Sequence, residues 1–243
     1  MLEVQSVTLR FGGLTALNGV SLNVKHHEIV GLIGTNGSGK STMFNLITGF
    51  YKPQSGKILF NDTEITGKSP EKICKMGIGR TFQIMKPFGS LTVFQNVLVG
   101  SYFGKKREDH EKSFRDHCLE MLRLTNLYEK RNKLVRDLTF ADQKRLELAR
   151  ALSARPSLLL LDEVMAGLNA TETLQYVDMI KDLRQKGLTV LIIEHVMKAI
   201  MLLTDRIYVL NSGQLIAQGT PEEIANDANV IQSYLGTDQF ARS

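Results

Sequence analysis

A glycine-rich run carries the clearest chemical signal in the sequence. It reads GTNGSGKS over residues 34–41 and fits the pattern G-x-x-x-x-G-K-[ST]. Glycines in such a loop let backbone N–H groups turn toward phosphate oxygens at the start of a helix. Lys40 would then reach the β- and γ-phosphates, and the Ser41 hydroxyl would bind Mg²⁺. The run therefore predicts a nucleoside triphosphate site. Its predicted contacts are Gly34, Thr35, Asn36, Gly37, Ser38, Gly39, Lys40, Ser41 and Thr42.

Two acidic residues follow a run of four leucines further along the chain. Residues 158–161 are all leucine, and Asp162 and Glu163 come next. A strand this apolar is buried in a sheet, and its carboxyl end lies at the edge where parallel sheets bind ligands. Asp162 is expected to hold Mg²⁺, directly or through water, and Glu163 to polarise the attacking water. His195 ends another apolar strand and is expected to stabilise phosphate charge or position the water.

The elements that would hold these groups alternate along the chain between strands and helices. Apolar residues ending at Gly187 mark one helix face, and Thr220-Pro221-Glu222-Glu223 has the cap, proline and glutamate of a helix start. This order predicts an α/β protein with a mostly parallel core sheet and an inserted helical part. The expected strands cover residues 4–11, 17–24, 28–33, 157–161, 188–193 and 207–210.

The middle of the chain differs from both ends in composition. From about residue 94 to 154 it is rich in helix-forming residues and almost free of Gly and Pro. Residues 104–155 hold 14 Lys or Arg and 9 Asp or Glu, which accounts for the whole net charge of +5. Such an excess is typical of a solvated helical face, and it also suits nucleic acid, an anionic membrane surface or an acidic partner.

Composition excludes several classes of protein. Hydrophobic residues make up 43% and charged residues 23% of 243 residues, as in ordinary globular domains rather than disordered chains. The longest unbroken apolar run is residues 199–203, whereas a membrane-spanning helix needs about 20 residues. The first residues show no apolar signal-peptide core. Cys74 and Cys118 suit free thiols in a reducing compartment, so we expect a cytosolic or peripheral protein.

Taken together, these motifs resemble the nucleotide-binding subunits of ABC transporters, from Val4 to Leu235. The resemblance implies a RecA-like P-loop NTPase fold with an N-terminal antiparallel β-subdomain and an inserted α-helical subdomain. The domain would cover residues 2–236: RecA-like and β lobes at about 2–83 and 156–225, a helical lobe at about 84–155, and a C-terminal helical tail at 221–243. It would bind ATP and Mg²⁺ and hydrolyse ATP.

The resemblance also implies roles for further residues. Phe11 falls at the aromatic position that stacks on adenine. Gln83, in the stretch GIGRTFQ, matches the glutamine of the Q-loop, which senses Mg²⁺. Glu163, His195 and Gln83 would be the catalytic group, and Ser41, Gln83 and Asp162 the Mg²⁺ ligands. The D-loop would be Ala166, Gly167, Leu168 and Asn169. The signature, which acts on the ATP of a partner subunit, would be Leu138, Thr139, Phe140, Ala141 and Asp142.

Within that family the sequence looks most like the ATP-binding proteins of branched-chain amino acid importers. Such a subunit works as a homodimer, or as a heterodimer with a sister ATPase, beneath integral membrane permeases. An extracytoplasmic solute-binding protein delivers the cargo, and no nucleic acid is involved. The subunit would be peripheral, on the cytoplasmic face of the cell membrane, and soluble when isolated. The stretches that carry the likeness are FGGLTALNGVSL, GIGRTFQ, DEVMAGLNA, LIIEHVMK, DRIYVLNSGQLIAQGTPEEI and VIQSYLG.

The signature departs from the usual Leu-Ser-Gly-Gly-Gln of the family. Thr139 keeps a hydroxyl for the γ-phosphate, but Ala141 adds a methyl group where a backbone N–H should approach closely. Asp142 places negative charge near a triphosphate unless it pairs with Lys144 or Arg145. Val164 replaces the proline that commonly follows the catalytic glutamate.

Alternatives to the importer follow from these observations. The altered signature allows a nucleotide-binding regulatory module with weak turnover. An ATPase for lipid or lipopolysaccharide export shares much of the same pattern. A soluble ABC protein of ribosomes or DNA usually has two nucleotide domains or a long coiled coil, and neither fits into 243 residues. The sequence also has no interleaved basic and aromatic stripe of the kind that binds nucleic acid.

Overall fold

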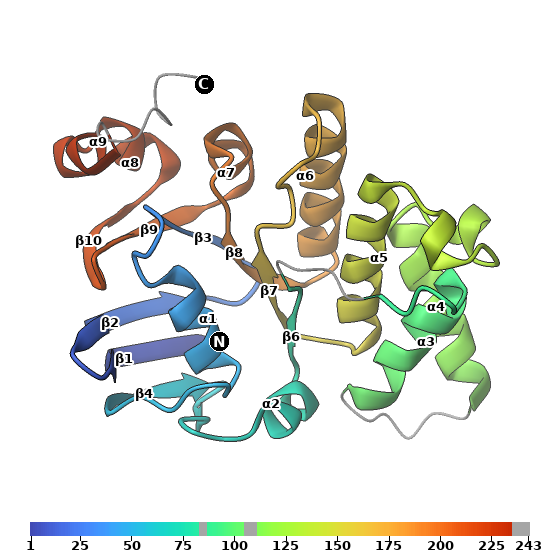
Figure 1. Ribbon diagram of the computed structural model, residues 1–243, viewed down its shortest axis with the longest axis horizontal. Coiled ribbons are helices and arrows are strands. Elements are labelled where there is room, and N and C mark those ends of the chain that lie inside the picture. The colour runs from blue at the N-terminus through green and yellow to red at the C-terminus, as the bar shows by residue number, and fades with distance from the viewer. Residues whose placement is uncertain (83–86, 105–110, 235–243) are drawn as a thin grey trace.

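Two sheets and a group of helices make up the protein in a computed structural model that describes residues 1–82, 87–104 and 111–234 (Figure 1). The larger sheet has six strands, and all are parallel except β10, which pairs antiparallel with β9. Its strands, in spatial order, are β10 (Gln214–Gly219), β9 (Arg206–Asn211), β3 (Ile29–Gly34), β8 (Thr189–Ile193), β7 (Leu158–Asp162) and β6 (Ile78–Arg80).

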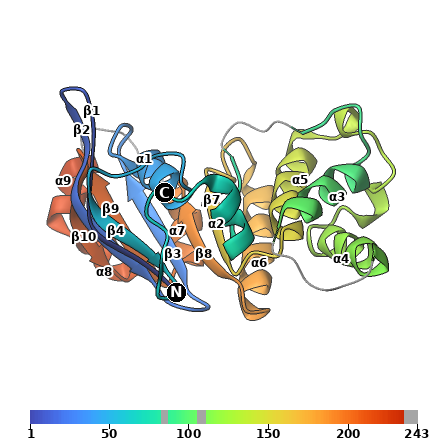
Figure 2. The same cartoon turned by 90° about the horizontal axis from the view of Figure 1, so that it is seen from below.

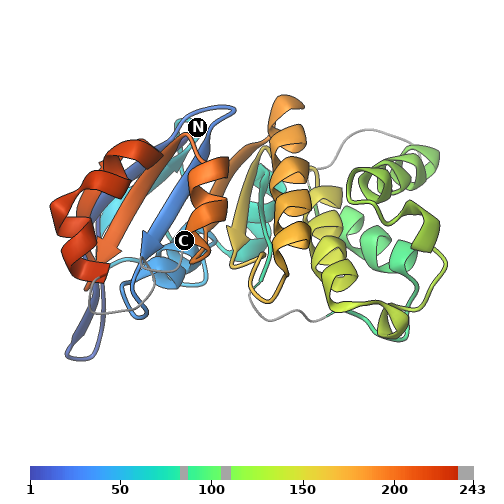
Figure 3. The ribbon, with the colours of Figure 1, turned by 90° about the horizontal axis from the view of Figure 1, so that it is seen from above.

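The smaller sheet is antiparallel and formed by the first part of the chain. It lies on the opposite side of the larger sheet from helices α6 and α7, as the views from below and above show (Figures 2 and 3). The α/β fold class predicted from the sequence is therefore confirmed. The strands of the smaller sheet are, in spatial order, β2 (Leu14–Val24), β1 (Leu2–Phe11), β4 (Ser55–Phe60) and β5 (Thr63–Glu64).

Nine α-helices and two 3₁₀ turns occur in the described residues. Helices α3, α4 and α5 pack on one another beside the β6 edge of the larger sheet (Figure 1). The helices are α1 (Lys40–Ile47), α2 (Pro70–Met76), α3 (Val93–Phe103), α4 (Glu111–Leu124), α5 (Phe140–Ser153), α6 (Ala170–Gln185), α7 (Met197–Leu203), α8 (Pro221–Asn226) and α9 (Ala228–Tyr234). The 3₁₀ turns are η1 (Tyr128–Lys130) and η2 (Val135–Asp137). Among the described residues, no helix combines the length and apolarity that crossing a membrane requires.

Strand β7 shows why the leucine run is buried on both sides. Side chains alternate between the two faces of a strand. Leu159 and Leu161 accordingly join the core under α6 and α7, whereas Leu158 and Leu160 join the core between the two sheets, with α1. Because all four leucine side chains are fully buried, β7 is fixed in the centre of the fold, and the position of Asp162 at its end is fixed with it.

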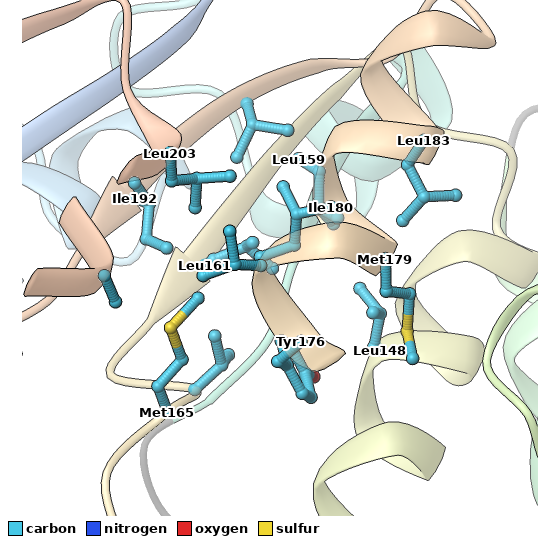
Figure 4. Packing of buried hydrophobic residues seen from close by; sticks show 14 of the residues in the cluster. Leu148, Leu159, Leu161, Met165, Tyr176, Met179, Ile180, Leu183, Ile192 and Leu203 are labelled. Atoms are coloured by element: carbon cyan, nitrogen blue, oxygen red, sulfur yellow. The ribbon is translucent and has the colours of Figure 1, made fainter. Parts of the chain in front are cut away.

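Helix α6 packs between the larger sheet and helix α5. Tyr176 and Met179 of α6 lie beside Leu148 of α5, while Ile180 faces Leu159 and Leu161 of β7 (Figure 4). The helix starts at a capping box, in which the Asn169 side chain accepts from the Glu172 N–H and the Glu172 side chain accepts in return. Each such cap stabilises a helix by about 1 kcal/mol. Helix α5 is thus held at a defined position relative to the carboxyl end of β7.

The predicted helix start at Thr220 is confirmed. Thr220 caps α8, Pro221 is its first residue, and the Thr220 and Glu223 side chains form a reciprocal capping box. Several short elements were not predicted, among them α2, β6 and α7. They span only three to seven residues, which is too short for a clear hydrophobic period.

Candidate nucleotide-binding site

Four neighbouring parallel strands end at the same edge of the larger sheet. In spatial order they are β3, β8, β7 and β6. Gly34 ends β3, Asp162 ends β7, His195 follows β8 by two residues, and Thr81 directly follows β6. Three predicted site residues that are far apart in the sequence therefore meet at one edge: Gly34, Asp162 and His195. Ligands of open α/β sheets bind at such an edge.

The loop between β3 and α1 has the backbone shape that its glycines allow. Gly39, the N-cap of α1, has a φ of 107°, and a Cβ added to it would lie 2.7 Å from the Ala16 carbonyl oxygen. A Cβ on Gly34 would lie 2.1 Å from the Leu210 carbonyl oxygen. Larger residues would therefore push the loop away from β2 and β9. The predicted order of strand, glycine loop and helix N-terminus is present here.

Lys40 fills this loop with its ammonium group. Its Nζ donates to the carbonyl oxygens of Gly34 at 2.7 Å and Thr35 at 2.9 Å, and the residue is only 8% exposed. Burial lowers the pKa of Lys40, and the negative charges of Glu163 and Asp162 oppose that shift. The three charged groups therefore share one electrostatic environment. Phosphate oxygens can replace the two carbonyl oxygens as stronger, charged acceptors.

Asp162 is held by the side chain of Arg80, which the sequence motif alone did not reveal. Its Oδ2 accepts from Arg80 at 2.8 Å, and Arg80 also donates to Asn45 at 2.7 Å and to Thr48 at 3.2 Å. The Asp162 Oδ1 is buried and has no hydrogen-bond partner among the described residues. Burial raises the pKa of Asp162, although Arg80 acts against this. A buried carboxylate oxygen with an open lone pair fits a hard cation such as Mg²⁺.

Glu163 and His195 lie together at the same edge. The Glu163 Oε2 is 3.9 Å from the His195 Nδ1. Glu163 has a φ of 50°, a left-handed conformation that costs energy in a residue other than glycine. Its N–H donates to the Ile193 carbonyl at 2.9 Å, and its carbonyl accepts from Lys144 Nζ at 3.2 Å. The structure thus brings together the predicted base and the predicted histidine.

Residues 138–142 lie at the start of α5. Thr139 caps the helix by accepting from the Asp142 N–H at 3.2 Å, and Thr139 and Phe140 are exposed. Asp142 is only 3% exposed and forms ion pairs with Lys130 and with Arg145, the latter at 3.4 Å. Arg145 was one of the two partners considered from the sequence. The other, Lys144, contacts the Glu163 carbonyl instead, and Lys130 was not anticipated.

The segment after Glu163 contacts the start of α5. A Cβ on Gly167, whose φ is 81°, would lie 3.0 Å from the Phe140 ring. The N–H of Ala166 donates to the Glu163 carbonyl at 3.3 Å, the N–H of Leu168 donates to Met165, and Asn169 then caps α6. The predicted D-loop and the predicted signature therefore touch within one chain.

Two other predicted residues have different outcomes. Phe11 ends β1, is 44% exposed and packs edge-to-face on Tyr51 with ring centroids 5.1 Å apart. The strand that follows it, β2, touches the glycine loop through Ala16 and Leu17. Stacking of Phe11 on adenine stays a prediction. Gln83 lies outside the described residues.

Sequence reasoning missed the roles of three charged residues, the half-buried Arg80 and the buried Lys144 and Glu194. Arg80 is the last residue of the short strand β6, within GIGRTFQ. Glu194 follows the apolar run of β8 and directly precedes His195. A charged residue at the carboxyl end of a buried strand is a usable signal for a site. Lys144 had no comparable signal, because α5 carries many charges and only the packing shows which of them point inward.

Comparison with known proteins agrees with this geometry. The family model "ABC transporter" matches residues 17–166, well over half of the chain. The chain belongs to the ABC transporter family. It is therefore an ABC ATPase, and its fold is that of an ATP-binding cassette. A second model, "Branched-chain amino acid ATP-binding cassette transporter", matches residues 214–239 of the cassette.

Curated relatives match the cassette over nearly its whole length. It is 43% identical to the high-affinity branched-chain amino acid transport ATP-binding protein LivG of Escherichia coli K12, with 97% of this chain and 98% of the relative covered. It is 41% identical, with the same coverage, to the corresponding protein BraF of Pseudomonas aeruginosa PAO1.

Solved structures agree in fold. An ATP-binding cassette of an ABC transporter in its ADP conformation superposes with a TM-score of 0.89 at 32% identity, over 97% of this chain and 98% of that one. A dimeric cassette in a post-hydrolysis state, bound to ADP and Pi, superposes with a TM-score of 0.80 at 27% identity, over 91% and 99%.

Proposed function

We propose that this cassette binds and hydrolyses ATP to energise an importer of branched-chain or other hydrophobic amino acids. The observation that carries the proposal is that Lys40, Asp162, Glu163 and His195 meet at one edge of the sheet. The cargo class is supported by the 41–43% identity to branched-chain amino acid transport proteins over 97% of the chain. The match at residues 214–239 supports the same class.

ATP would bind with its phosphates in the glycine loop. The loop N–H groups and Lys40 would hold the β- and γ-phosphates, and Phe11 would stack on the adenine. Ser41, Asp162 and Gln83 would hold Mg²⁺, and the open Oδ1 of Asp162 supports this assignment. When bound, Mg²⁺ neutralises charge on the phosphate oxygens.

Hydrolysis would begin with a water placed between Glu163 and the γ-phosphate. The Glu163 carboxylate accepts a proton from the water as the water oxygen bonds to the γ-phosphorus. The bond between the γ-phosphorus and the oxygen that bridges it to the β-phosphate breaks, and ADP leaves with the electron pair of that bond. His195, within 3.9 Å of Glu163, would donate to the γ-phosphate oxygens and stabilise their charge.

A dimer would complete each ATP site. Thr139 and Phe140 are exposed at the start of α5, with the helix N-terminus behind them, so they can face the phosphates of a second subunit. Asp142 is turned inward toward Lys130 and Arg145, which removes the repulsion expected from its charge. The related dimeric cassette bound to ADP and Pi supports this arrangement.

The permease would dock on an apolar groove beside α2 and α3. This groove, of about 420 Å³, lies between the end of β6 and helices α3 and α5. Aromatic side chains that are 45–66% exposed line it, which is unusual unless they meet a partner. An apolar segment from the cytoplasmic side of a membrane permease fits this surface. The lining phenylalanines are Phe50, Phe82, Phe88 and Phe103.

The test is to purify the tagged Glu163→Gln variant with ATP from detergent-solubilised native membranes and to identify the proteins that co-purify. Two polytopic permeases are expected. The wild-type complex, reconstituted in vesicles with its binding protein, should take up labelled leucine only when ATP is present. ATP-driven movement of lipid or lipopolysaccharide without leucine uptake would favour the exporter. Recovery of ribosomes, nucleic acid or no membrane protein would overturn the transport role.

A further inference from the structure

Two buried charged residues near the site have no part in the chemistry described so far. Glu194 is 1% exposed and Lys144 is 5% exposed. Burying a charge is costly unless other groups compensate it, so each of these residues needs partners. The hydrogen-bond partners of both residues lie on the backbone of the turn that carries Glu163.

Glu194 contacts the backbone of the turn that carries Glu163. Its Oε1 accepts from the Met165 N–H at 2.7 Å, two residues after Glu163. The N–H groups of Met165 and His195 both favour the charged form of this carboxylate. The Oε2 is buried and makes no hydrogen bond within the part of the chain that the structure describes. Since Glu194 directly precedes His195 in the chain, this hydrogen bond connects the turn that carries Glu163 to the segment that carries His195.

Lys144 reaches the same turn from helix α5. Its Nζ donates to the Glu163 carbonyl oxygen at 3.2 Å, and its own carbonyl accepts from the buried Tyr176 hydroxyl at 3.1 Å. Among nearby carboxylates, Glu194 does most to support the positive charge of Lys144. Since Lys144 belongs to α5, this contact joins the helix that begins with the signature to the catalytic turn.

The turn that carries Glu163 needs support from neighbouring residues. Glu163 has a φ of 50°, and neighbouring contacts must offset the cost of that conformation. Displacement of a reacting group by about 1 Å can lower a rate about a hundredfold. Buried charged side chains that served stability alone would not both need to contact the backbone of this turn.

We propose that Lys144 and Glu194 are positioning residues that clamp the Glu163 turn and couple it to the signature helix α5. The clamp fixes the Glu163 carbonyl through Lys144, and the Met165 N–H through Glu194, which directly precedes His195 in the chain. Movement of α5 against a partner subunit would then change the position of the catalytic base. This inference rests on the proposed roles of Glu163 and His195 in hydrolysis, and it is independent of the cargo.

The test compares Glu194→Gln, Lys144→Met and the double variant in the full-length chain, by turnover at saturating ATP and by ATP affinity. Each single variant should lower kcat about tenfold, or about 1.4 kcal/mol, and leave affinity within about twofold. The double variant should lose no more than about the larger single loss, because both residues act on one turn. Losses that multiply would overturn the clamp.

Glu28→Gln is the matched control. Glu28 forms an ion pair with Arg206 at 2.5 Å, but it precedes β3 and so lies at the opposite edge of the sheet. Its kcat should stay within about twofold of wild type. Equal kcat for Glu194→Gln and Glu28→Gln would contradict the proposal. Should Glu194→Gln fail to fold, Lys144→Arg, which keeps the charge, should retain the turnover that Lys144→Met loses. Equal loss in both lysine variants would also contradict it.

Stability separates positioning from a merely structural role. Burial raises the pKa of Glu194 from 4.5 to about 7, despite Lys144 and the two N–H groups. Glu163, Tyr176 and Lys144 are the titratable groups facing it. A raised carboxyl pKa stabilises the fold below pH 4.5, and this contribution is lost as pH rises to about 7.

Wild-type stability should therefore fall relative to Glu194→Gln over this pH range, while the variant stays the slower enzyme at neutral pH. A variant that is both less stable at neutral pH and unaffected in kcat would overturn the proposal. Failure of the proposed hydrolytic site would give a different result, because Glu163→Gln would then keep its turnover.

Discussion

The glycine loop and the start of α5 are both expected to meet phosphate, yet they are built in different ways. The loop is made by consecutive residues, and its shape depends on glycine conformations and on Lys40, whose ammonium contacts Gly34 and Thr35. The start of α5 depends on charged residues from elsewhere in the chain, as Asp142 shows through its ion pair with Lys130. The difference indicates that ATP binding is local, whereas turnover depends on packing between distant elements.

The largest expected effect breaks the local half of this comparison. Lys40→Ala removes a nearly buried cation from the phosphate cradle. Loss of such a charged partner costs about 3 kcal/mol, so ATP affinity should fall about a hundredfold or more. Titration with a fluorescent ATP analogue measures it.

Lys57→Ala is the control for that titration, because Lys57 is an exposed lysine on β4. It should bind ATP as the wild type does. Equal affinity of Lys40→Ala and Lys57→Ala would remove Lys40 from the phosphate site.

A medium effect is expected at Asp142. Asp142→Asn leaves Lys130 and Arg145 without their carboxylate, and breaking this partly buried network should lower the free energy of unfolding by about 2 kcal/mol. ATP affinity of the isolated chain should be unchanged. Urea unfolding measures the first quantity and nucleotide titration the second.

Glu71→Gln serves as the comparison for Asp142→Asn, since Glu71 pairs with Lys75 on the exposed face of α2. It should unfold like the wild type. An Asp142→Asn variant as stable as Glu71→Gln would show that the inward charge does not hold the start of α5.

The smallest effect is expected from Ala141→Gly. Ala141 is the second residue of α5, where the N-cap Thr139 already orders the turn, so a glycine there should raise turnover by no more than about twofold. Phosphate release at saturating ATP measures this. A rise of tenfold or more would mean that the native signature limits turnover, and it would favour the nucleotide-binding regulatory module.

The fold and the local half of the site could be predicted from the sequence. Glycine spacing, four consecutive leucines and the Thr220 cap are short-range signals that tertiary packing did not override. They placed β3 and β7 close to their observed bounds and the start of α8 at its observed residue.

The distant half could not be predicted, for a physical reason. Arg80 meets Asp162 across 82 residues, and Lys130 reaches Asp142 through the turn η1. Each pairing depends on where two distant segments lie in space. From the sequence alone, any of several charged residues could be the partner. Lys144 shows the consequence, because spacing made it a partner for Asp142 and packing placed it on Glu163.

The central claim is that ATP binds locally and is hydrolysed with Glu163 as the base. Its most direct test measures phosphate release, ATP affinity and mass by light scattering for Glu163→Gln in the full-length chain, with Glu64→Gln on the exposed strand β5 as the control. The account predicts no detectable turnover for Glu163→Gln, ATP affinity within about twofold of wild type, and an ATP-dependent dimer. Undiminished phosphate release by Glu163→Gln would contradict it.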